Sequence, residues 1–185
     1  MSKTKKEVLI FDESTFKRVI SRIASEIIEK NPDLDKLVLI GIKKGGTYLK
    51  ERIKKEIEER ENIKIDTGDI DITLYRDDIS RIGYNPKLET TEIPLNLNDK
   101  FVVLIDDVLF TGRTVRAAMD ALFDFGRPKR IQLAVMIDRG HRELPIQADF
   151  VGKEVPTSKK EIVEVNFKEV QGKDCVILRD KNAKR

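Results

Sequence analysis

The chain has 185 residues, of which 39% are hydrophobic and 37% are charged, so it can bury one core but is too short for two ordinary domains. No apolar run approaches the roughly 20 residues of a membrane-spanning helix, and the amino terminus does not resemble a signal peptide, so we expect one cytoplasmic domain over residues 1–185 with no membrane partner. The 36 basic residues nearly balance the 33 acidic ones, and the single cysteine and single histidine exclude an internal disulfide and make structural zinc very unfavourable.

The hydrophobic pattern predicts strands that alternate with helices. In chain order, the predicted elements are a strand at 8–11, a helix at 12–30, a strand at 37–40, a helix at 48–60, strands at 70–75 and 101–105, a helix at 114–122, and strands at 131–137, 148–151, 162–167 and 175–178. Such alternation is typical of an α/β fold with a mainly parallel central sheet flanked by helices. The long polar stretch at 76–100 predicts a functional or mobile loop.

In parallel sheets, ligands bind beyond the carboxyl ends of the strands, and the loop at 106–113 is the most informative of these. Asp106 and Asp107 follow a buried strand, and the turn at 111–113 leads into a helix that we expect Thr114 to cap. Backbone N–H groups at such a helix start can bind a phosphate, and paired carboxylates can accept hydrogen bonds from vicinal hydroxyls. The arrangement predicts a site for a phosphorylated sugar, and the alternative is an ordinary turn with two solvated aspartates.

Other phosphate motifs fit less well, because the chain has neither G-x-x-x-x-G-K-[ST] nor G-x-G-x-x-G after a strand. The segment 102–114 runs Val-Val-Leu-Ile-Asp-Asp-Val-Leu-Phe-Thr-Gly-Arg-Thr. It resembles the phosphoribosyl-diphosphate (PRPP) motif of type I phosphoribosyltransferases.

Further segments resemble one subfamily, the bacterial pyrimidine operon attenuation proteins, which also have uracil phosphoribosyltransferase activity. These segments are 71–78, 119–122, 126–128, 138–146 and 156–158. The resemblance extends from about residue 10 to about residue 167. It implies a type I phosphoribosyltransferase fold with a small hood, a mobile loop at about 76–98 and a carboxyl-terminal tail at about 179–185.

The resemblance implies catalysis by positioning and charge stabilisation, converting uracil and PRPP into UMP and pyrophosphate. Asp106 and Asp107 would bind the ribose hydroxyls, Arg76 would close over the pyrophosphate, and Mg²⁺, held mainly through PRPP, would neutralise it. The other implied substrate-binding residues are Lys43, Lys44 and Gly45 for pyrophosphate, Val108, Leu109, Phe110, Thr111, Gly112, Arg113 and Thr114 for the 5′-phosphate, and Met136, Ile137 and Arg139 for uracil.

Two residues near the implied uracil site have open roles. Arg139 either contacts the substrate or forms a local ion pair with Asp138. His141 is a base, an RNA ligand or an ordinary surface residue.

The resemblance also implies regulation, in which UMP or UTP in the PRPP site favours binding of pyrimidine operon leader mRNA and early transcription termination. The implied RNA-binding residues are Arg18, Arg22, Arg142 and Lys153. A homodimer or homotetramer would multiply this basic surface, and no DNA partner is implied. The alternative is that the arginines only solvate a helix face.

The sequence departs from the subfamily at three places. Lys44-Gly45 stands where Thr-Arg is usual, so one guanidinium is absent and the catalytic rate stays open. Ser25 replaces a common histidine and Gln147 an arginine, which weakens the expected RNA face. Two alternatives therefore remain, a type I phosphoribosyltransferase for another base without RNA regulation and a regulator with weak or lost catalysis.

Overall fold

The computed structural model describes residues 7–75, 77, 91–93 and 96–181. The strands and helices are β1 (Val8–Phe11), α1 (Glu13–Lys30), β2 (Leu37–Ile42), α2 (Gly45–Glu61), β3 (Asp66–Ile70), β4 (Phe101–Leu109), α3 (Arg113–Leu122), β5 (Arg130–Asp138), β6 (Phe150–Glu154), β7 (Glu161–Asn166), α4 (Lys168–Gln171) and β8 (Cys175–Asp180). Short 3₁₀ turns lie at Leu34–Lys36, Thr73–Tyr75 and Phe123–Phe125.

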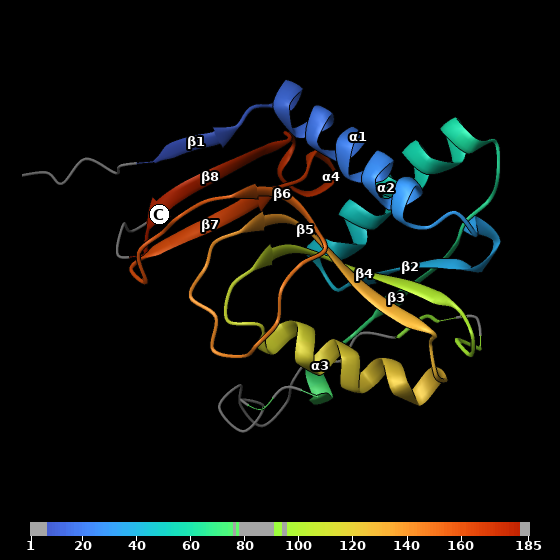
Figure 1. The fold of residues 1–185 in the computed structure, drawn as a ribbon. Helices are drawn as coiled ribbons and strands as arrows, with labels where there is room; N and C mark the ends of the chain where they lie inside the picture. The colour runs from blue at the N-terminus through green and yellow to red at the C-terminus, as the bar shows by residue number, and fades with distance from the viewer. Residues whose placement is uncertain (1–6, 76, 78–90, 94–95, 182–185) are drawn as a thin grey trace, which may run out of the picture.

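The strands form two sheets. The central sheet has the order β3-β2-β4-β5-β6, and all of its strand pairs are parallel. Helices α1 and α2 cover one face of it and α3 covers the other (Figure 1). This confirms the predicted α/β architecture. The second sheet, with the antiparallel order β1-β8-β7, joins the two ends of the chain and lies beside the central sheet.

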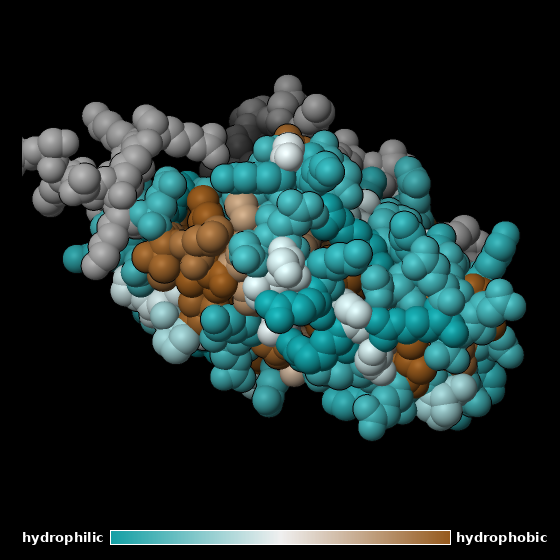
Figure 2. All heavy atoms as spheres, turned by 90° about the horizontal axis from the view of Figure 1, so that it is seen from above, coloured by the Kyte–Doolittle hydropathy of each residue, from teal (hydrophilic) through white to brown (hydrophobic). Residues whose placement is uncertain are grey.

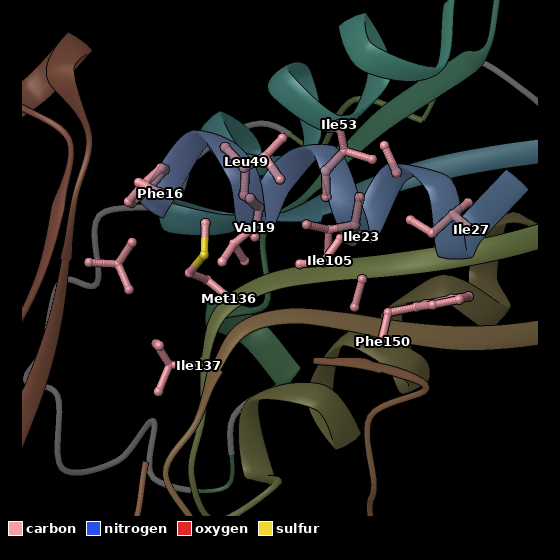
Figure 3. Close-up of a cluster of buried hydrophobic side chains, with 14 of the residues drawn as sticks. Phe16, Val19, Ile23, Ile27, Leu49, Ile53, Ile105, Met136, Ile137 and Phe150 are labelled. Carbon is pink, nitrogen blue, oxygen red and sulfur yellow. The ribbon is translucent and has the colours of Figure 1, made fainter. Parts of the chain in front are cut away.

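Helix α1 begins and packs as its sequence predicts. The Asp12 side chain accepts a hydrogen bond from the Thr15 backbone N–H at 2.8 Å, which caps the helix and lowers the pKa of Asp12. The apolar face of α1 packs against α2 and the central sheet (Figure 3). Each fully buried Ile or Phe side chain on that face contributes about 1.5–3 kcal/mol.

The predicted strand at 70–75 was wrong. The observed strand, β3, is earlier and spells Asp-Thr-Gly-Asp-Ile, while Thr73–Tyr75 is a 3₁₀ turn. Pairing with β2 specifies β3 through its backbone, and Glu92 adds a short antiparallel bridge to Asp69. A Cβ at Gly68 would lie 2.8 Å from the Glu92 carbonyl oxygen, so glycine permits this close approach.

Strand β4 extends beyond the predicted boundary of 101–105. Its parallel pairing with β5 continues through Asp106 and Val108, so Asp106 and Asp107 lie within the strand and not in a turn after it. The expected cap was also wrong. Helix α3 begins at Arg113, and the N-cap is Gly112, whose φ of 91° suits glycine. Strand β6 lies slightly later than the predicted 148–151.

Two predicted segments lie largely or partly outside the described residues. These are the mobile loop at about 76–98, including Arg76, and the tail at about 179–185, of which residues up to 181 are described. Strand β8 continues through Asp180, past its predicted end.

Among the described helices, none combines the length and the hydropathy that crossing a bilayer requires.

Candidate active site

The first turn of α2 lies directly against the carboxyl half of β4. A Cβ built on Gly45 would lie 2.2 Å from Asp107 Oδ2, and one on Gly46 would lie 2.1 Å from the Ile105 carbonyl oxygen. Only glycine permits this approach without movement of a neighbour. The predicted pyrophosphate loop and the predicted ribose carboxylates are therefore adjacent, although they are far apart in the sequence.

Asp106 and Asp107 form a tightly coupled pair of carboxyl groups. Asp106 is buried, and its Oδ1 accepts a hydrogen bond from the Asp107 N–H at 2.9 Å. Burial raises the pKa of Asp106 well above its usual value, and the Asp107 charge raises it further. Burial also raises the pKa of Asp107, whose Oδ1 accepts from the Val108 N–H at 2.8 Å. Two buried carboxyl groups this close together are suited to bind a cation or to accept hydrogen bonds from hydroxyl groups.

A cavity of about 290 Å³ lies at the end of β4 and the start of α3. The residues that line it are Asp77, Asp106, Val108, Leu109, Phe110, Thr111, Gly112, Arg113, Thr114 and Val115. All seven residues of the predicted 5′-phosphate loop thus line one hollow at a helix amino terminus, where backbone N–H groups and the helix dipole favour an anion.

Two arginines brace this hollow. Arg113 pairs with Asp77 and, through Nε at 2.7 Å, with Glu143. Arg142 donates to the carbonyl oxygens of Ile146 and Phe110, each at 2.8 Å, and pairs with Asp138. The loop after β5 is therefore fastened to the predicted phosphate loop. Arg142 acts as an internal brace here, and its contact with RNA stays a prediction.

Asp138 thus pairs with Arg142, so the alternative ion pair with Arg139 was wrong. The Arg139 guanidinium carbon instead lies 4.1 Å from the Phe110 ring centroid. Its Nε donates to Thr157 Oγ1 at 3.2 Å and its Nη2 to the Ser158 carbonyl at 3.0 Å. Burial lowers the pKa of Arg139.

His141 contacts the same two residues as Arg139, namely Thr157 and Phe110. Its Nε2 lies 2.6 Å from the Thr157 carbonyl oxygen, and its ring meets the edge of Phe110 at 6.0 Å between centroids. The side chains of Met136 and Ile137 are fully buried in the core. Any contact of these two residues with a base must therefore come from backbone atoms.

The remaining predicted residues lie apart from this cavity. The Lys43 N–H donates to the Ile70 carbonyl, which ties the predicted pyrophosphate loop to β3. Arg18 and Lys153 are exposed. Arg22 pairs with Glu26 and also donates to the Val151 and Gly152 carbonyls, so it fastens α1 to β6.

A buried ionic network near the pyrophosphate loop was not anticipated. Lys50 Nζ lies 2.8 Å from Asp69 Oδ2, and Thr47 Oγ1 donates to Asp69 Oδ1 at 2.8 Å. A Cβ at Gly41 would lie 2.8 Å from that same Oδ1 atom. The sequence carries a weak signal for the network in the Thr-x-x-Lys spacing on α2, which places both side chains on one helix face.

The fold resembles solved hypoxanthine phosphoribosyltransferases. The structure from Trypanosoma cruzi superimposes with a TM-score of 0.71 at 18% identity, covering 93% of this chain and 96% of that one. A Staphylococcus aureus structure gives 0.70 at 19% identity, covering 95% and 93%. Residues 9–170 match the phosphoribosyl transferase domain family. The chain therefore belongs to the phosphoribosyltransferase family.

Within this family, curated relatives are much closer in sequence. A protein named bifunctional protein PyrR from Clostridioides difficile is 56% identical over 171 residues, covering 92% of this chain and 97% of the relative. The protein of that name from Listeria monocytogenes serotype 4b is 53% identical over 180 residues, covering 96% and 98%. At this identity and coverage the chain belongs with the bifunctional PyrR proteins, which confirms the predicted subfamily.

Proposed function

We propose that this protein is a cytoplasmic uracil phosphoribosyltransferase and a uridine-nucleotide-sensing regulator that binds the leader mRNA of the pyrimidine operon and promotes its early termination. The observation that carries the catalytic half is the contact between the first turn of α2 and Asp107, beside the cavity at residues 106–115. In this arrangement one PRPP molecule would contact three neighbouring parts of the chain: the proposed pyrophosphate loop, the two carboxylates that bind the ribose, and the proposed phosphate loop. Membership of the PyrR group carries the regulatory half.

In the proposed reaction, a uracil nitrogen bonds to C1 of the ribose, the bond from C1 to the pyrophosphate oxygen breaks, and the nitrogen releases its proton. Asp106 and Asp107 accept hydrogen bonds from the ribose hydroxyls, and their charge favours the electron-poor ring of the transition state. The N–H groups at the start of α3 hold the 5′-phosphate. Arg139, stacked on Phe110, lies beside the position proposed for uracil.

The protein side chains at this site can hold Mg²⁺ only together with phosphate groups of the substrate. Asp106 and Asp107 supply two carboxylates, and no group of three or more His, Cys, Asp or Glu side chains suited to a metal ion occurs within the described part of the chain. Mg²⁺ in such sites is usually held by one or two carboxylates together with substrate phosphates. We expect PRPP to bring the ion, which neutralises the departing pyrophosphate.

Pyrophosphate release from PRPP, measured with Mg²⁺ and each of three bases, tests the enzyme. We expect release with uracil and little with hypoxanthine or orotate. Release with either of those bases but not with uracil would refute the substrate. Loss of all activity, with UMP still bound, would instead favour a regulator that keeps the pocket as a sensor. Lys44-Gly45 is a physical reason why catalysis could be lost, since a lysine offers one point charge where the guanidinium usual in the subfamily offers a planar fork.

Titration of a leader stem-loop with and without UMP tests the regulator. We expect UMP to tighten RNA binding, because product in the PRPP site and RNA on the surface would favour the same state of the protein. Sedimentation of the same samples would distinguish the proposed dimer and tetramer. Equal RNA affinity with and without UMP would remove nucleotide sensing from the proposal.

A further inference from the structure

An arginine of α2 reaches onto the exposed face of α1. Arg60 lies in the last turn of α2, and its guanidinium donates to the hydroxyls of both Ser21 and Ser25. It also pairs with Glu56 at 2.8 Å, one turn earlier on its own helix. These contacts fix a side chain that would otherwise extend freely into solvent.

The two serines belong to a polar stripe on α1. Residues 18, 21, 22 and 25 follow helical spacing and therefore share one face. Arg18 is exposed, and the Arg22 side chain is 45% exposed. Arg60 thus adds a third guanidinium to a stripe that already carries two. Figure 2 views this side of the molecule and shows hydrophilic residues over most of it, with a hydrophobic patch at the end where Figure 1 places β1.

The acidic partners of these arginines are weakly held. Glu26 pairs with Arg22 and Glu56 with Arg60, and both pairs are helical neighbours four residues apart at the surface. Such pairs contribute only about 0.3–0.5 kcal/mol. A phosphate, which forms stronger bidentate contacts with a guanidinium, can displace either glutamate at small cost.

We propose that Arg60 is an RNA-binding residue of this protein, held by Ser21 and Ser25 in position to contact a phosphate of the RNA backbone. The inference rests on the RNA-binding half of the proposed function. It also bears on Ser25, which stands where a histidine is common on this helix, because Arg60 of α2 supplies a positive charge at that same place. The contact is with the backbone, so it strengthens binding to all stem-loops alike.

The test compares Arg60→Ala with Lys55→Ala, measured as affinity for a leader stem-loop in the presence of UMP over a range of salt concentrations. Lys55 lies on the same helix, and Lys55→Ala removes the same charge, but the Lys55 side chain is 75% exposed and pairs with Glu59 of its own helix. We expect Arg60→Ala to weaken binding about tenfold and to reduce the slope of log affinity against log salt by about one, while Lys55→Ala matches wild type. A stem-loop with a scrambled loop sequence should show the same proportional loss.

The double variant Ser21→Ala/Ser25→Ala keeps the charge of Arg60 but removes its anchors, and it should lose part of the affinity. The rate of pyrophosphate release and the melting temperature of each variant report on folding, since Arg60 lies outside the proposed catalytic site. If Arg60→Ala keeps the RNA affinity and the salt slope of wild type, the role of Arg60 is overturned. The RNA-binding function of the protein would then still stand. A changed sedimentation mass in Arg60→Ala would also overturn it, because the residue would then join copies of the chain. Absence of RNA binding by wild type would instead refute the proposed function itself.

Discussion

Lys50 and Asp69 form an ion pair of 2.8 Å that is almost closed to solvent, with the lysine side chain 2% exposed. The pair joins the first half of α2 to the end of β3, and Thr47 donates to the second oxygen of the same carboxylate. The turn that carries Lys43, Lys44 and Gly45 comes just before Thr47 in the chain, and its Lys43 N–H donates to the carbonyl of Ile70, the residue after Asp69. The network therefore fixes the base of the proposed pyrophosphate loop to the sheet.

Lys50→Met should destabilise the protein by about 3 kcal/mol, because it leaves the Asp69 carboxylate mostly buried without its cation. The same change should raise the KM for PRPP more than the KM for uracil, since only the pyrophosphate loop loses support. Chemical denaturation and steady-state kinetics measure the two effects. Lys55→Met, at an exposed position of the same helix, is the matched control and should change neither.

The double variant Lys50→Met/Asp69→Asn distinguishes the loss of the ion pair from the effect of changing the packing of the two side chains. Removing both charges leaves no uncompensated buried ion, because the other partner of Lys50, Glu51, is 55% exposed, so the double variant should recover part of the stability lost by Lys50→Met alone. Additive losses in the double variant would show that the two groups do not act as a pair.

Gly46→Ala should destabilise the protein by about 1–3 kcal/mol through overpacking. The new Cβ would lie 2.1 Å from the Ile105 carbonyl, a backbone atom that cannot turn away. Helix α2 must then withdraw from β4, and the pyrophosphate loop must move with it. We expect a lower melting temperature and weaker PRPP binding by calorimetry. An unchanged PRPP affinity would show that this close approach does not position the loop.

The sequence predicted the central strands and the first helix closely, because their apolar residues follow a clear period. It missed β3, since two of the five residues in Asp66–Ile70 are aspartates and a third is glycine. Pairing with β2 and the bridge to Glu92 create that strand, and neither contact is visible in local pattern. The error hid the Lys50–Asp69 pair too, because Asp69 can be placed opposite α2 only when β3 is known.

The residues of the predicted phosphate loop line one cavity, but their local structure was predicted incorrectly. A preference for turns at Asp106-Asp107 suggested that the strand had ended, whereas parallel pairing carries β4 on to Leu109. The bracing by Arg142 was likewise missed. It depends on contacts with Phe110 and Asp138, which meet only when β4 and β5 lie side by side.

Arg139→Lys should raise the KM for uracil about tenfold and leave the KM for PRPP nearly unchanged. The planar guanidinium stacks on Phe110 and donates to both Thr157 and the Ser158 carbonyl, and a lysine ammonium cannot make all three contacts. Initial-rate kinetics with each substrate varied in turn measure the split. Arg179→Lys in β8, where the arginine pairs with Glu164, should leave both values unchanged. Equal rises in both KM values after Arg139→Lys would point to general disorder of the loop.

Asp106→Asn should stabilise the protein at neutral pH while lowering kcat/KM about 100-fold or more through loss of transition-state charge stabilisation. Burial raises the pKa of Asp106 in the folded chain, so the folded state keeps a proton over a pH range in which the unfolded state has released it. Stability contributed by this group is therefore present in acid and is lost as pH rises through that range.

Asparagine removes the charge and keeps an oxygen that can accept from the Asp107 N–H. The melting temperature of Asp106→Asn should exceed that of wild type at pH 7, and the difference should shrink as pH falls toward 3.8, the ordinary pKa of aspartate. Asp35→Asn, at an exposed position, should show no such trend. A difference that grows in acid would mean that the Asp106 carboxylate stabilises the fold in its charged form, contrary to the effect of its burial.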